Sequence, residues 1–453
     1  MESVDHFELS KEFLERFGEA IENKNAAFIH DSLEGVNPVD ITALLNEFSG
    51  TQSKYVLGLM TLETAAEIIN GLDTDVRVKF LQEFTTLEIS RFINELDSDD
   101  GADIINELPI KLREEVIEGI EDKEKATNVL ELLRYDEDCA GGLMAKELIK
   151  ANVNWSIGKT IEEIRRQAEN VQKVYAVYVV DDFDRLVGRV SMKKIVLAED
   201  HMKVSSIYDE EVISVETYRD EEEIASIMRK YDLEALPVVN RQGKLVGRIT
   251  IDDVVDVITE IAEQERQLMA GISEDVEEDD SIWMLTRARL PWLVIGMLGG
   301  LLGALFMETF EKNITLTLTF FIPLIMATGG NVGIQSSSLV VQSLANKTAF
   351  SRTAYKRLWK VFWVAILNGV LLALMVLLGV QFLMGSDLKL ASIVAISLLS
   401  VVLLASFMGT ATPLLLDKLG INPALASGPF ITTANDLLGL AVYFGVAHLL
   451  YSM

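Results

Sequence analysis

The sequence contains one cysteine, Cys139, and only four histidines, which are scattered along the chain. A single cysteine excludes an intramolecular disulfide and a cysteine-rich zinc site, and the histidines lack metal-ligand spacing. There is no nucleophile–base pair and no phosphate-binding loop, so we expect no enzyme activity. The first residues are polar and acidic and carry no secretory signal, so we expect the N-terminal part to remain in the cytoplasm.

Positive charge is also scarce, with 40 Lys and Arg against 69 Asp and Glu and a net charge of -29. Residues 290–453 hold eight Lys and Arg and five Asp and Glu, which leaves a net charge of -32 on residues 1–289. Such an acidic region argues against nucleic acid or anionic lipid as its partner and suits metal cations. Because 49% of the chain is hydrophobic, the contrast indicates an acidic soluble half followed by a membrane half.

Seven units of 12 residues fill the stretch 37–120, and the first reads NPVDITALLNEF. Each unit opens with Asn, Ser, Thr, Asp or Pro, which start helices, and is apolar at its eighth, ninth and twelfth positions. Those positions share one face of a short helix. The repeat predicts stacked short helices, an acidic solenoid within an all-α domain of residues 1–137. Its acidic side chains are densest at Asp97, Asp99, Asp100 and Asp103.

A second repeat has a period of 59, because 176–196 aligns without a gap with 234–255. Each copy predicts strand, turn, strand and helix, preceded by another helix. The pattern resembles a tandem pair of α+β CBS domains, which we place at 138–200 and 201–260. The resemblance implies ligand sensing, with ATP or another adenosine nucleotide held by a Gly-x-x-Thr-x-x-Asp run. That run is Gly247, Thr250 and Asp253 in the second copy, whereas Lys194 replaces the Asp in the first copy.

A long charged helix is predicted over 254–281, where it connects the CBS pair to a five-span α-helical membrane domain of residues 282–453. The expected spans are 290–310, 316–345, 360–384, 390–415 and 424–450. The loop between the second and third spans carries Lys347, Arg352, Lys356, Arg357 and Lys360. The positive-inside rule then predicts a multi-pass protein of the cell membrane with a cytoplasmic N-terminus and an external C-terminus.

Asp436 lies near the middle of the last span, and a charge at that depth usually faces a cavity or an ion path. Thr432 and Thr433 precede it by one turn. The second span is unusually polar, and its candidate pore residues are Gly329, Asn331 and Gln335. An alternative for this polar run is hydrogen bonding between helices.

The combination of acidic helical domain, CBS pair, connecting helix and five spans resembles the MgtE-type magnesium channels or transporters. The most specific residues are the run Gly329–Gly333 with Gln335, and Ser427-Gly428-Pro429 with Asp436. The resemblance implies a homodimer in the lipid bilayer that conducts Mg²⁺ passively. It also implies that Asp436 is the selectivity carboxylate, paired with its copy across the dimer interface.

The same family pattern implies regulatory metal ligands on the CBS pair and the connecting helix. Asp232, Asp253 and Asp256 match it, and Glu222 and Glu263 are further candidates. On the solenoid we favour Asp97 and Asp100. Cytosolic Mg²⁺ bridging these carboxylates would compact the region, and the connecting helix would close the pore as negative feedback.

Two other functions remain open at this stage. A transporter of Co²⁺, Mn²⁺ or Ni²⁺ is the first alternative, although the His, Met and Cys clusters of a soft-metal path are missing. A membrane-anchored CBS sensor is the second, but Asp436 and the polar second span do not suit purely dimerising helices.

Overall fold

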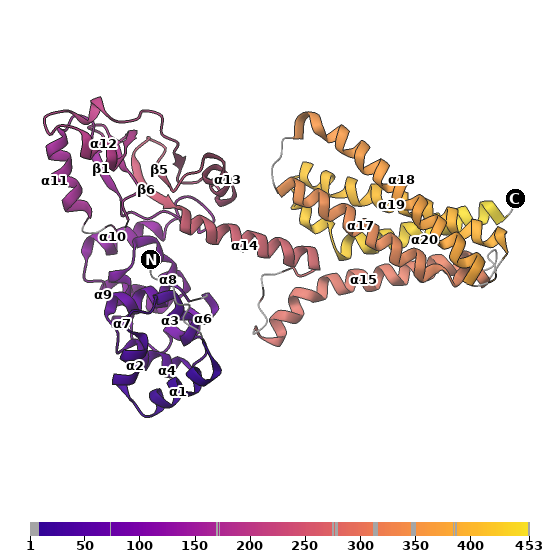
Figure 1. Ribbon diagram of the computed structural model, residues 1–453, viewed down its shortest axis with the longest axis horizontal. Helices are drawn as coiled ribbons and strands as arrows, with labels where there is room; N and C mark the ends of the chain where they lie inside the picture. Colours follow the sequence, from indigo (N-terminus) through magenta and orange to yellow (C-terminus); the bar gives the residue numbers. More distant parts are fainter. Residues whose placement is uncertain are drawn as a thin grey trace. The chain divides into compact units, whose positions relative to one another are not determined.

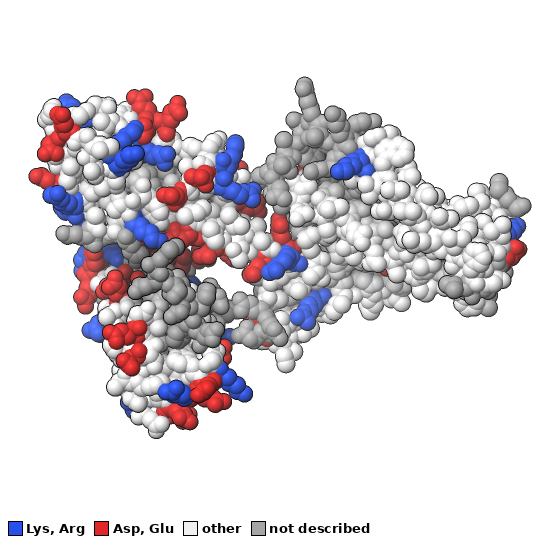
Figure 2. All heavy atoms as spheres, viewed as in Figure 1, with Lys and Arg blue, Asp and Glu red and all other residues white. Residues whose placement is uncertain are grey.

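The computed structural model describes residues 9–72, 74–168, 171, 173–273, 276, 280–310, 316–345, 350–383, 385 and 387–451. The chain folds into two compact units, which we call the N-terminal unit (Met1–Ile258) and the membrane unit (Thr259–Met453) (Figure 1). Each unit is described by itself. Charged side chains gather on the N-terminal unit, whereas long stretches of the membrane unit expose none (Figure 2).

Within the described residues, ten short helices open the N-terminal unit. They are α1 (Lys11–Glu22), α2 (Ala26–Leu33), α3 (Pro38–Leu45), α4 (Gly50–Leu57), α5 (Leu62–Asn70), α6 (Thr74–Leu81), α7 (Thr86–Glu95), α8 (Ser98–Glu107), α9 (Ile110–Gly119) and α10 (Lys123–Leu132). The N-cap residues of α3, α4, α5, α7, α8 and α9 fall at the openings of the 12-residue units. The predicted seven helices are therefore confirmed as α3–α9.

The core of these helices comes from the positions that the repeat marked as apolar. The eighth and ninth residues of the third and sixth units, Ile68, Ile69, Ile104 and Ile105, are each at most 1% exposed. Helices two apart in sequence pack against each other, as α3 does on α5, α5 on α7 and α7 on α9. The helices thus form a continuous two-layered stack, in which no single repeat could bury its apolar face alone.

Two three-stranded sheets with flanking helices follow in the described part of the chain. Their elements are β1 (Ile149–Asn152), α11 (Ile157–Gln167), β2 (Val177–Val180), β3 (Leu186–Val190), α12 (Met192–Leu197), η2 (Val204–Ser206), β4 (Val215–Glu216), α13 (Glu221–Tyr231), β5 (Ala235–Val239) and β6 (Leu245–Thr250). The orders β1-β2-β3 and β4-β5-β6 are the same, parallel and then antiparallel. Val179 pairs with Gly188 and Val238 with Gly247, so the sheets repeat the 59-residue period pair by pair.

Helix α14 (Ile251–Ala270) leaves the second CBS copy and passes from one unit into the other. The predicted helix 254–281 was wrong at its C-terminal end. Gly271 has a left-handed φ of 81°, a conformation that commonly ends helices. The described residues between Gly271 and Ser281 are not helical.

The membrane unit contains long apolar helices. Its elements are α15 (Ile282–Phe310), α16 (Leu316–Thr319), α17 (Ile322–Ala345), α18 (Phe350–Leu383), α19 (Leu388–Lys418), η4 (Pro423–Ala426) and α20 (Pro429–Tyr451). Five segments of the described residues are long and apolar enough to span a membrane, as predicted. Lys347 lies outside the described residues, and the side chains of Arg352, Lys356 and Arg357 also lie outside them.

The last predicted span is divided near its start. Gly428 adopts a left-handed φ of 56° between η4 and α20, so the helix that carries Asp436 begins only at Pro429. A β-carbon on Gly428 would lie 2.0 Å from the carbonyl oxygen of Met269, and one on Gly271 would lie 2.4 Å from the Pro429 ring. The end of α14 and the start of α20 therefore meet without room for a β-carbon at either Gly271 or Gly428, which only glycine allows here. We call this contact the glycine joint.

Candidate cation sites

The first site lies at the N-terminus of α8, whose opening residues are the acidic run of the sixth repeat unit. Asp97 is the N-cap residue, yet its side chain makes no capping hydrogen bond. Glu147, which lies 49 residues after Ser98, instead accepts hydrogen bonds from Ser98 N (3.1 Å) and Ser98 Oγ (2.7 Å). Glu147 thus satisfies a helix-end donor, and the Asp97 carboxylate remains available for other partners.

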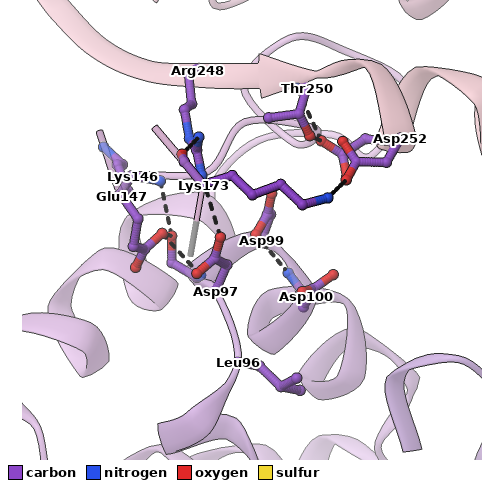
Figure 3. A network of polar contacts seen from close by, with 12 residues as sticks. Leu96, Asp97, Asp99, Asp100, Lys146, Glu147, Lys173, Arg248, Thr250 and Asp252 are labelled. Atoms are coloured by element: carbon purple, nitrogen blue, oxygen red, sulfur yellow. Dashed lines mark hydrogen bonds and ion pairs between the residues drawn. The ribbon is translucent and has the colours of Figure 1, made fainter. Parts of the chain in front are cut away.

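Three carboxylates converge there. Asp97, Asp99 and Glu147 each offer an oxygen within 4.8 Å of the other two, and we call them the acidic trio. Asp99 is 9% exposed and its Oδ1 accepts from the backbone N of Asp100 at 3.0 Å (Figure 3). Oxygen ligands in this number are what Mg²⁺ prefers, with water completing an octahedron. The trio can therefore hold a hard divalent cation.

The carboxyl groups at the start of α8 have raised pKa values, because their surroundings disfavour the ionised form. Burial, followed by the charge of Glu147, raises the pKa of Asp97 to about 6, although Arg248 opposes the shift. Burial and the neighbouring Asp100 raise the pKa of Asp99 well above its ordinary value. Burial also raises the pKa of Asp100 to about 6 and that of Asp103 to about 7. These groups repel one another when ionised, and a bound divalent cation would relieve the repulsion.

The structure brings some of the predicted regulatory residues to the trio and leaves others apart. Asp253 lies within electrostatic reach, because its charge raises the pKa of Asp97 and Asp99. Its Oδ2 accepts a hydrogen bond from Thr250 N at 3.1 Å. Burial, followed by the nearby Asp252, raises the pKa of Asp256 on the next turn of α14. Asp253 on α14 therefore adds a further negative charge near the trio.

Glu222, Asp232 and Glu263 are exposed, and none of them belongs to the cluster of carboxylates found among the described residues. Asp232 caps α13 in the left-handed conformation (φ 52°), which Asp tolerates better than most residues. Glu263 pairs with Arg266 at 3.2 Å in the other compact unit. Sequence reasoning missed Glu147, because no local pattern links it to α8. It named Asp99 only as one residue of the acidic run in the sixth repeat unit, whereas the structure shows Asp99 to be the most buried of that run.

A cavity of about 170 Å³ lies between the two CBS copies. Its lining comes from both repeats: Ala176, Tyr178, Arg189, Glu211, Val212, Ile213, Tyr231, Leu233, Ala235 and Pro237. The predicted nucleotide residues Gly247, Thr250 and Asp253 are not among them. A β-carbon on Gly247 would lie 2.6 Å from the sulfur of Met144, and Thr250 bonds to Asp253. The predicted nucleotide run is therefore engaged in packing and in the acidic network.

The second site is Asp436 on α20, in the membrane unit. Its side chain is half-buried, and among the described residues no hydrogen bond or ion pair engages it. Thr433 packs on α15, since it fills the space where Gly299 would carry a β-carbon. Thr432 faces Gly330 of α17, and its hydroxyl donates to the backbone oxygen of Pro429 at 3.0 Å. Asp436 thus lies on a helix that contacts both α15 and α17.

The polar residues of α17 separate into two faces. Ser337 donates to the Ala426 carbonyl oxygen at 3.1 Å, and Ser336 donates to Ser406 Oγ at 3.3 Å. These serines therefore join helices, as the alternative interpretation of the polar run expected. Asn331 and Gln335, by contrast, are exposed, and their side chains make no hydrogen bond within the described part of the chain. Gly329 faces α19, where it packs against Val401.

One close crossing fixes α17, α19 and α20 together. A β-carbon on Gly333 would lie 1.9 Å from Nδ2 of Asn435, and one on Gly409 would lie 2.4 Å from the carbonyl oxygen of Gly333. Asn435 itself is 3% exposed, and within the described residues neither of its amide atoms has a partner. Asp436 therefore follows a residue that is locked between helices.

Comparison with known protein families matches almost the entire chain. A family model described as a divalent cation transporter, MgtE, matches residues 322–446, and the MgtE intracellular N domain matches residues 36–138. The CBS domain model matches residues 140–201 and 204–260. The magnesium transporter MgtE of Thermus thermophilus is 32% identical over 443 residues, which cover 95% of this chain and 97% of that protein.

The chain belongs to the MgtE family. The predicted resemblance is therefore confirmed. The magnesium transporter MgtE of Enterococcus faecalis is also similar to this MgtE-family chain, with 33% identity over 329 residues and 72% of each chain covered.

Solved structures cover the N-terminal unit of this MgtE-family chain. One is the cytosolic domain of the Mg²⁺ channel MgtE in complex with ATP, with 31% identity and a TM-score of 0.51. It covers 54% of this chain and 99% of that structure. The soluble part of a magnesium transporter, at 24% identity and a TM-score of 0.50, shows the same fold. The predicted fold class, with a helical N-domain, a CBS pair and five long membrane helices, is confirmed.

Proposed function

We propose that the protein is a membrane channel or transporter that lets Mg²⁺ enter the cell passively, with Asp436 as its selective cation ligand. The observation that carries the proposal is the half-buried Asp436 carboxylate. It lies in a unit whose described residues include five long apolar helices, and it forms no hydrogen bond or ion pair with any described side chain. An unpaired carboxylate in hydrocarbon is costly, so such a residue marks an ion path. Relatives named magnesium transporters support the choice of ion.

The chemistry of the ion suits a site with few protein ligands. Mg²⁺ gives up its water reluctantly, so one or two carboxylates can hold it through its hydration shell. An inside-negative membrane potential would draw a dication inward with roughly 4.6 kcal/mol per 100 mV, since two charges move. No coupled energy source is then needed. A site that binds a hydrated ion discriminates less among dications, so Co²⁺, Mn²⁺ and Ni²⁺ remain the alternative substrates.

We propose a homodimer in which Asp436 meets its copy or faces a shared path. Two features of the membrane unit support this arrangement. Asn331 and Gln335 lie one helical turn apart on an exposed face of α17, and amides in contact with lipid tails are unfavourable. On α15, a β-carbon added to Gly296 or Gly300 would meet no heavy atom within 4 Å, which leaves a smooth groove for another helix.

Feedback by cytosolic Mg²⁺ is the proposed regulation, with the acidic trio as its sensor. Asp97, Asp99 and Glu147 come from two domains, so a cation that binds them would hold those domains together. Asp100, Asp253 and Asp256 would add negative charge around the same ion, while Glu222, Asp232 and Glu263 would bind further ions outside the trio. The glycine joint between α14 and α20 supports a mechanical route from this region to the helix of Asp436.

A nucleotide is proposed to bind in the 170 Å³ cavity between the CBS copies. A relative's cytosolic domain has been solved in complex with ATP, which supports an adenosine nucleotide as the ligand. Tyr178, Tyr231 and Arg189 line the cavity and offer aromatic surface and positive charge for a base and phosphates. The Gly247, Thr250 and Asp253 run would then act from outside the cavity.

The proposed topology has the N-terminal unit in the cytoplasm and the C-terminus outside. The basic residues Lys347, Arg352, Lys356, Arg357 and Lys360, which precede or lie within the first turns of α18, support a cytoplasmic position for this end of the helix. Trp359, Phe362 and Trp363 form a cluster with ring centroids 5.6 to 6.0 Å apart near Lys360, and tryptophans favour the membrane–water interface.

Divalent uptake into proteoliposomes tests the proposed transport. Purified protein is reconstituted, and uptake of Mg²⁺, Co²⁺, Mn²⁺ and Ca²⁺ is compared with and without Mg²⁺ on the side of the N-terminal unit. The proposal expects Mg²⁺ uptake that follows an imposed potential and falls when Mg²⁺ bathes the N-terminal unit. Uptake that ignores the potential would contradict a passive path, and uptake of Co²⁺ with exclusion of Mg²⁺ would select the alternative substrate.

A further inference from the structure

A buried arginine lies directly against the acidic trio. Arg248 is on β6 and only 5% of it is exposed. Its backbone pairs in both directions with Ala145, since Arg248 N donates to Ala145 O at 2.9 Å and Ala145 N donates to Arg248 O at 2.8 Å. Because Ala145 stands two residues before Glu147, this pairing fixes the arginine and one member of the trio to the same piece of backbone.

The guanidinium group of Arg248 contacts three different groups: a carboxylate, a backbone carbonyl and an aromatic ring. Its Nη2 lies 3.5 Å from Oδ2 of Asp97, and its Nη1 donates to the Lys173 carbonyl oxygen at 3.0 Å (Figure 3). The guanidinium carbon lies 5.4 Å from the centre of the Tyr175 ring. The Nε atom is buried and has no partner among the described residues. A charged pair usually lies at about 2.7 to 2.9 Å, so the guanidinium only loosely holds Asp97.

The nearby lysines are engaged elsewhere. Lys146 Nζ pairs with Glu131 at 2.8 Å. Lys125 Nζ donates to the carbonyl oxygens of Asn94 and Leu96. Among the ion pairs of the described residues, the one with Arg248 is the pair that reaches the acidic trio. Among the described residues, Arg248 is therefore the one cation that forms an ion pair with the trio, and a guanidinium cannot lose its charge at physiological pH.

We propose that Arg248 is a tethered competitor of Mg²⁺ at Asp97, which sets the Mg²⁺ concentration at which the acidic trio fills. The inference rests on the proposed regulatory site and adds a residue that controls its affinity. Mg²⁺ and its water need the carboxylate oxygens that face the guanidinium, and two cations repel each other at this separation. The ion must therefore displace the guanidinium from Asp97 before it binds.

The surroundings of Arg248 allow that exchange. When the guanidinium leaves Asp97, it keeps the hydrogen bond to Lys173 O and the aromatic face of Tyr175, which attracts a cation. Without Mg²⁺, the same guanidinium offsets part of the repulsion within the trio. Arg248 therefore holds the two domains loosely together when Mg²⁺ is low and raises the Mg²⁺ concentration needed to lock them.

The first CBS copy supplies a matched control. Arg189 stands at the equivalent position of the 59-residue repeat, next to Gly188 as Arg248 is next to Gly247. Its backbone pairs with Asp209 in the same two-way manner. Arg189 is exposed and lines the cavity between the copies, away from the trio. Arg189→Gln removes the same charge from the same sheet position without changing the acidic cluster.

The experiment measures hydrogen–deuterium exchange of α8 and of residues 143–148 in the full chain in nanodiscs, during a Mg²⁺ titration at constant ionic strength. We expect Arg248→Gln to exchange faster without Mg²⁺ and to lower the Mg²⁺ midpoint for protection by about tenfold, because one competing charge has gone. Arg248→Lys keeps the charge and should stay within about twofold of wild type. Because Arg189 lines the proposed nucleotide cavity, all variants are compared without nucleotide, and under these conditions Arg189→Gln should leave the midpoint of α8 unchanged.

Tyr175→Leu provides a second test that does not depend on the folding of the Arg248 variants. The substitution removes the surface to which the guanidinium withdraws, so the proposed competition predicts a higher Mg²⁺ midpoint. An unchanged or raised midpoint in folded Arg248→Gln would overturn the proposal. If that variant does not fold, an unchanged or lowered midpoint in Tyr175→Leu overturns it. Wild-type α8 that gains no protection from Mg²⁺ would instead refute the regulatory site itself.

Discussion

The acidic trio of the N-terminal unit gathers carboxylates from two domains of one chain, whereas the Asp436 carboxylate of the membrane unit has no hydrogen bond or ion pair to the described residues. The trio is surrounded by backbone donors, a guanidinium and further acids, and it is complete within one chain. Asp436 is surrounded by interhelical packing and needs water or a second copy to complete a coordination shell. This difference fits the proposed division of roles, in which the trio is a sensor that holds an ion and Asp436 lies on a path through which ions pass.

The largest expected effect is the loss of transport when the lone carboxylate is removed. Asp436→Asn should reduce Mg²⁺ uptake into proteoliposomes to the background of empty vesicles, because a neutral amide attracts a hydrated dication far less than a carboxylate does. The matched control is Asp417→Asn, an exposed carboxylate near the end of α19, which should transport normally. Normal uptake by folded Asp436→Asn protein would break the comparison, since the membrane unit would then need no acid.

The next effect is on regulation rather than transport. Asp99→Asn should leave uptake intact but abolish its inhibition by Mg²⁺ on the side of the N-terminal unit, since one ligand of the trio is gone. Burial raises the pKa of Asp99 well above its ordinary value, so the neutral amide should also raise the melting temperature of the Mg²⁺-free protein. Asp103→Asn, outside the trio, should retain inhibition. Retained inhibition in Asp99→Asn would show that the sensor lies elsewhere.

A smaller effect is expected from the packing that holds Asp436 in place. Gly333→Ala should destabilise the membrane unit by about 1 to 3 kcal/mol, because its β-carbon would overlap the Asn435 amide. The measurement is thermal aggregation of the detergent-solubilised protein. Gly445→Ala on α20, where a β-carbon meets nothing within 4 Å, is the control and should melt like wild type. Equal melting of the two variants would mean that the crossing is not tight.

The smallest effect is on pH dependence. The pKa of Asp97 is raised to about 6 and that of Asp103 to about 7, so the folded Mg²⁺-free unit binds protons more tightly than the unfolded chain. Its stability should therefore rise as the pH falls from above 7 through 6, and the full gain should be present below the ordinary carboxyl pKa of about 4. Saturating Mg²⁺ should flatten this dependence by replacing protons. Melting curves with and without Mg²⁺ test it, and Asp97→Asn should reduce the slope.

The sequence predicted the parts of the fold that repeat. Helices α3–α9 follow from capping residues and apolar positions at fixed spacing, and the two CBS sheets follow from a gapless internal alignment. The sequence did not predict features that depend on the backbone conformation of one residue or on a contact between residues far apart in the chain. The left-handed Gly271 ends α14 at a place where composition still favoured a helix.

The candidate sites were predictable to a similar degree. Asp436 and Asp97 were identified from depth in a span and from charge density. Glu147 was missed because its link to Ser98 spans 49 residues and depends on a helix-end donor that no local pattern encodes. The serines of α17 could not be separated from Asn331 and Gln335 by sequence, since only the packed helices reveal which polar face is paired.

The 12-residue repeat has a further consequence for how this domain can change in length. A whole unit can be gained or lost and every following helix still turns its apolar residues toward the stack, whereas one residue inserted within a helix would rotate the residues after it by about 100° about the helix axis. The N-cap of α10 is Asp122, thirteen residues after Pro109, the N-cap of α9, so the regular spacing stops there. Helices α3–α9 thus lie in interchangeable units of equal length, whereas α10 begins after a different spacing and ends the regular stack.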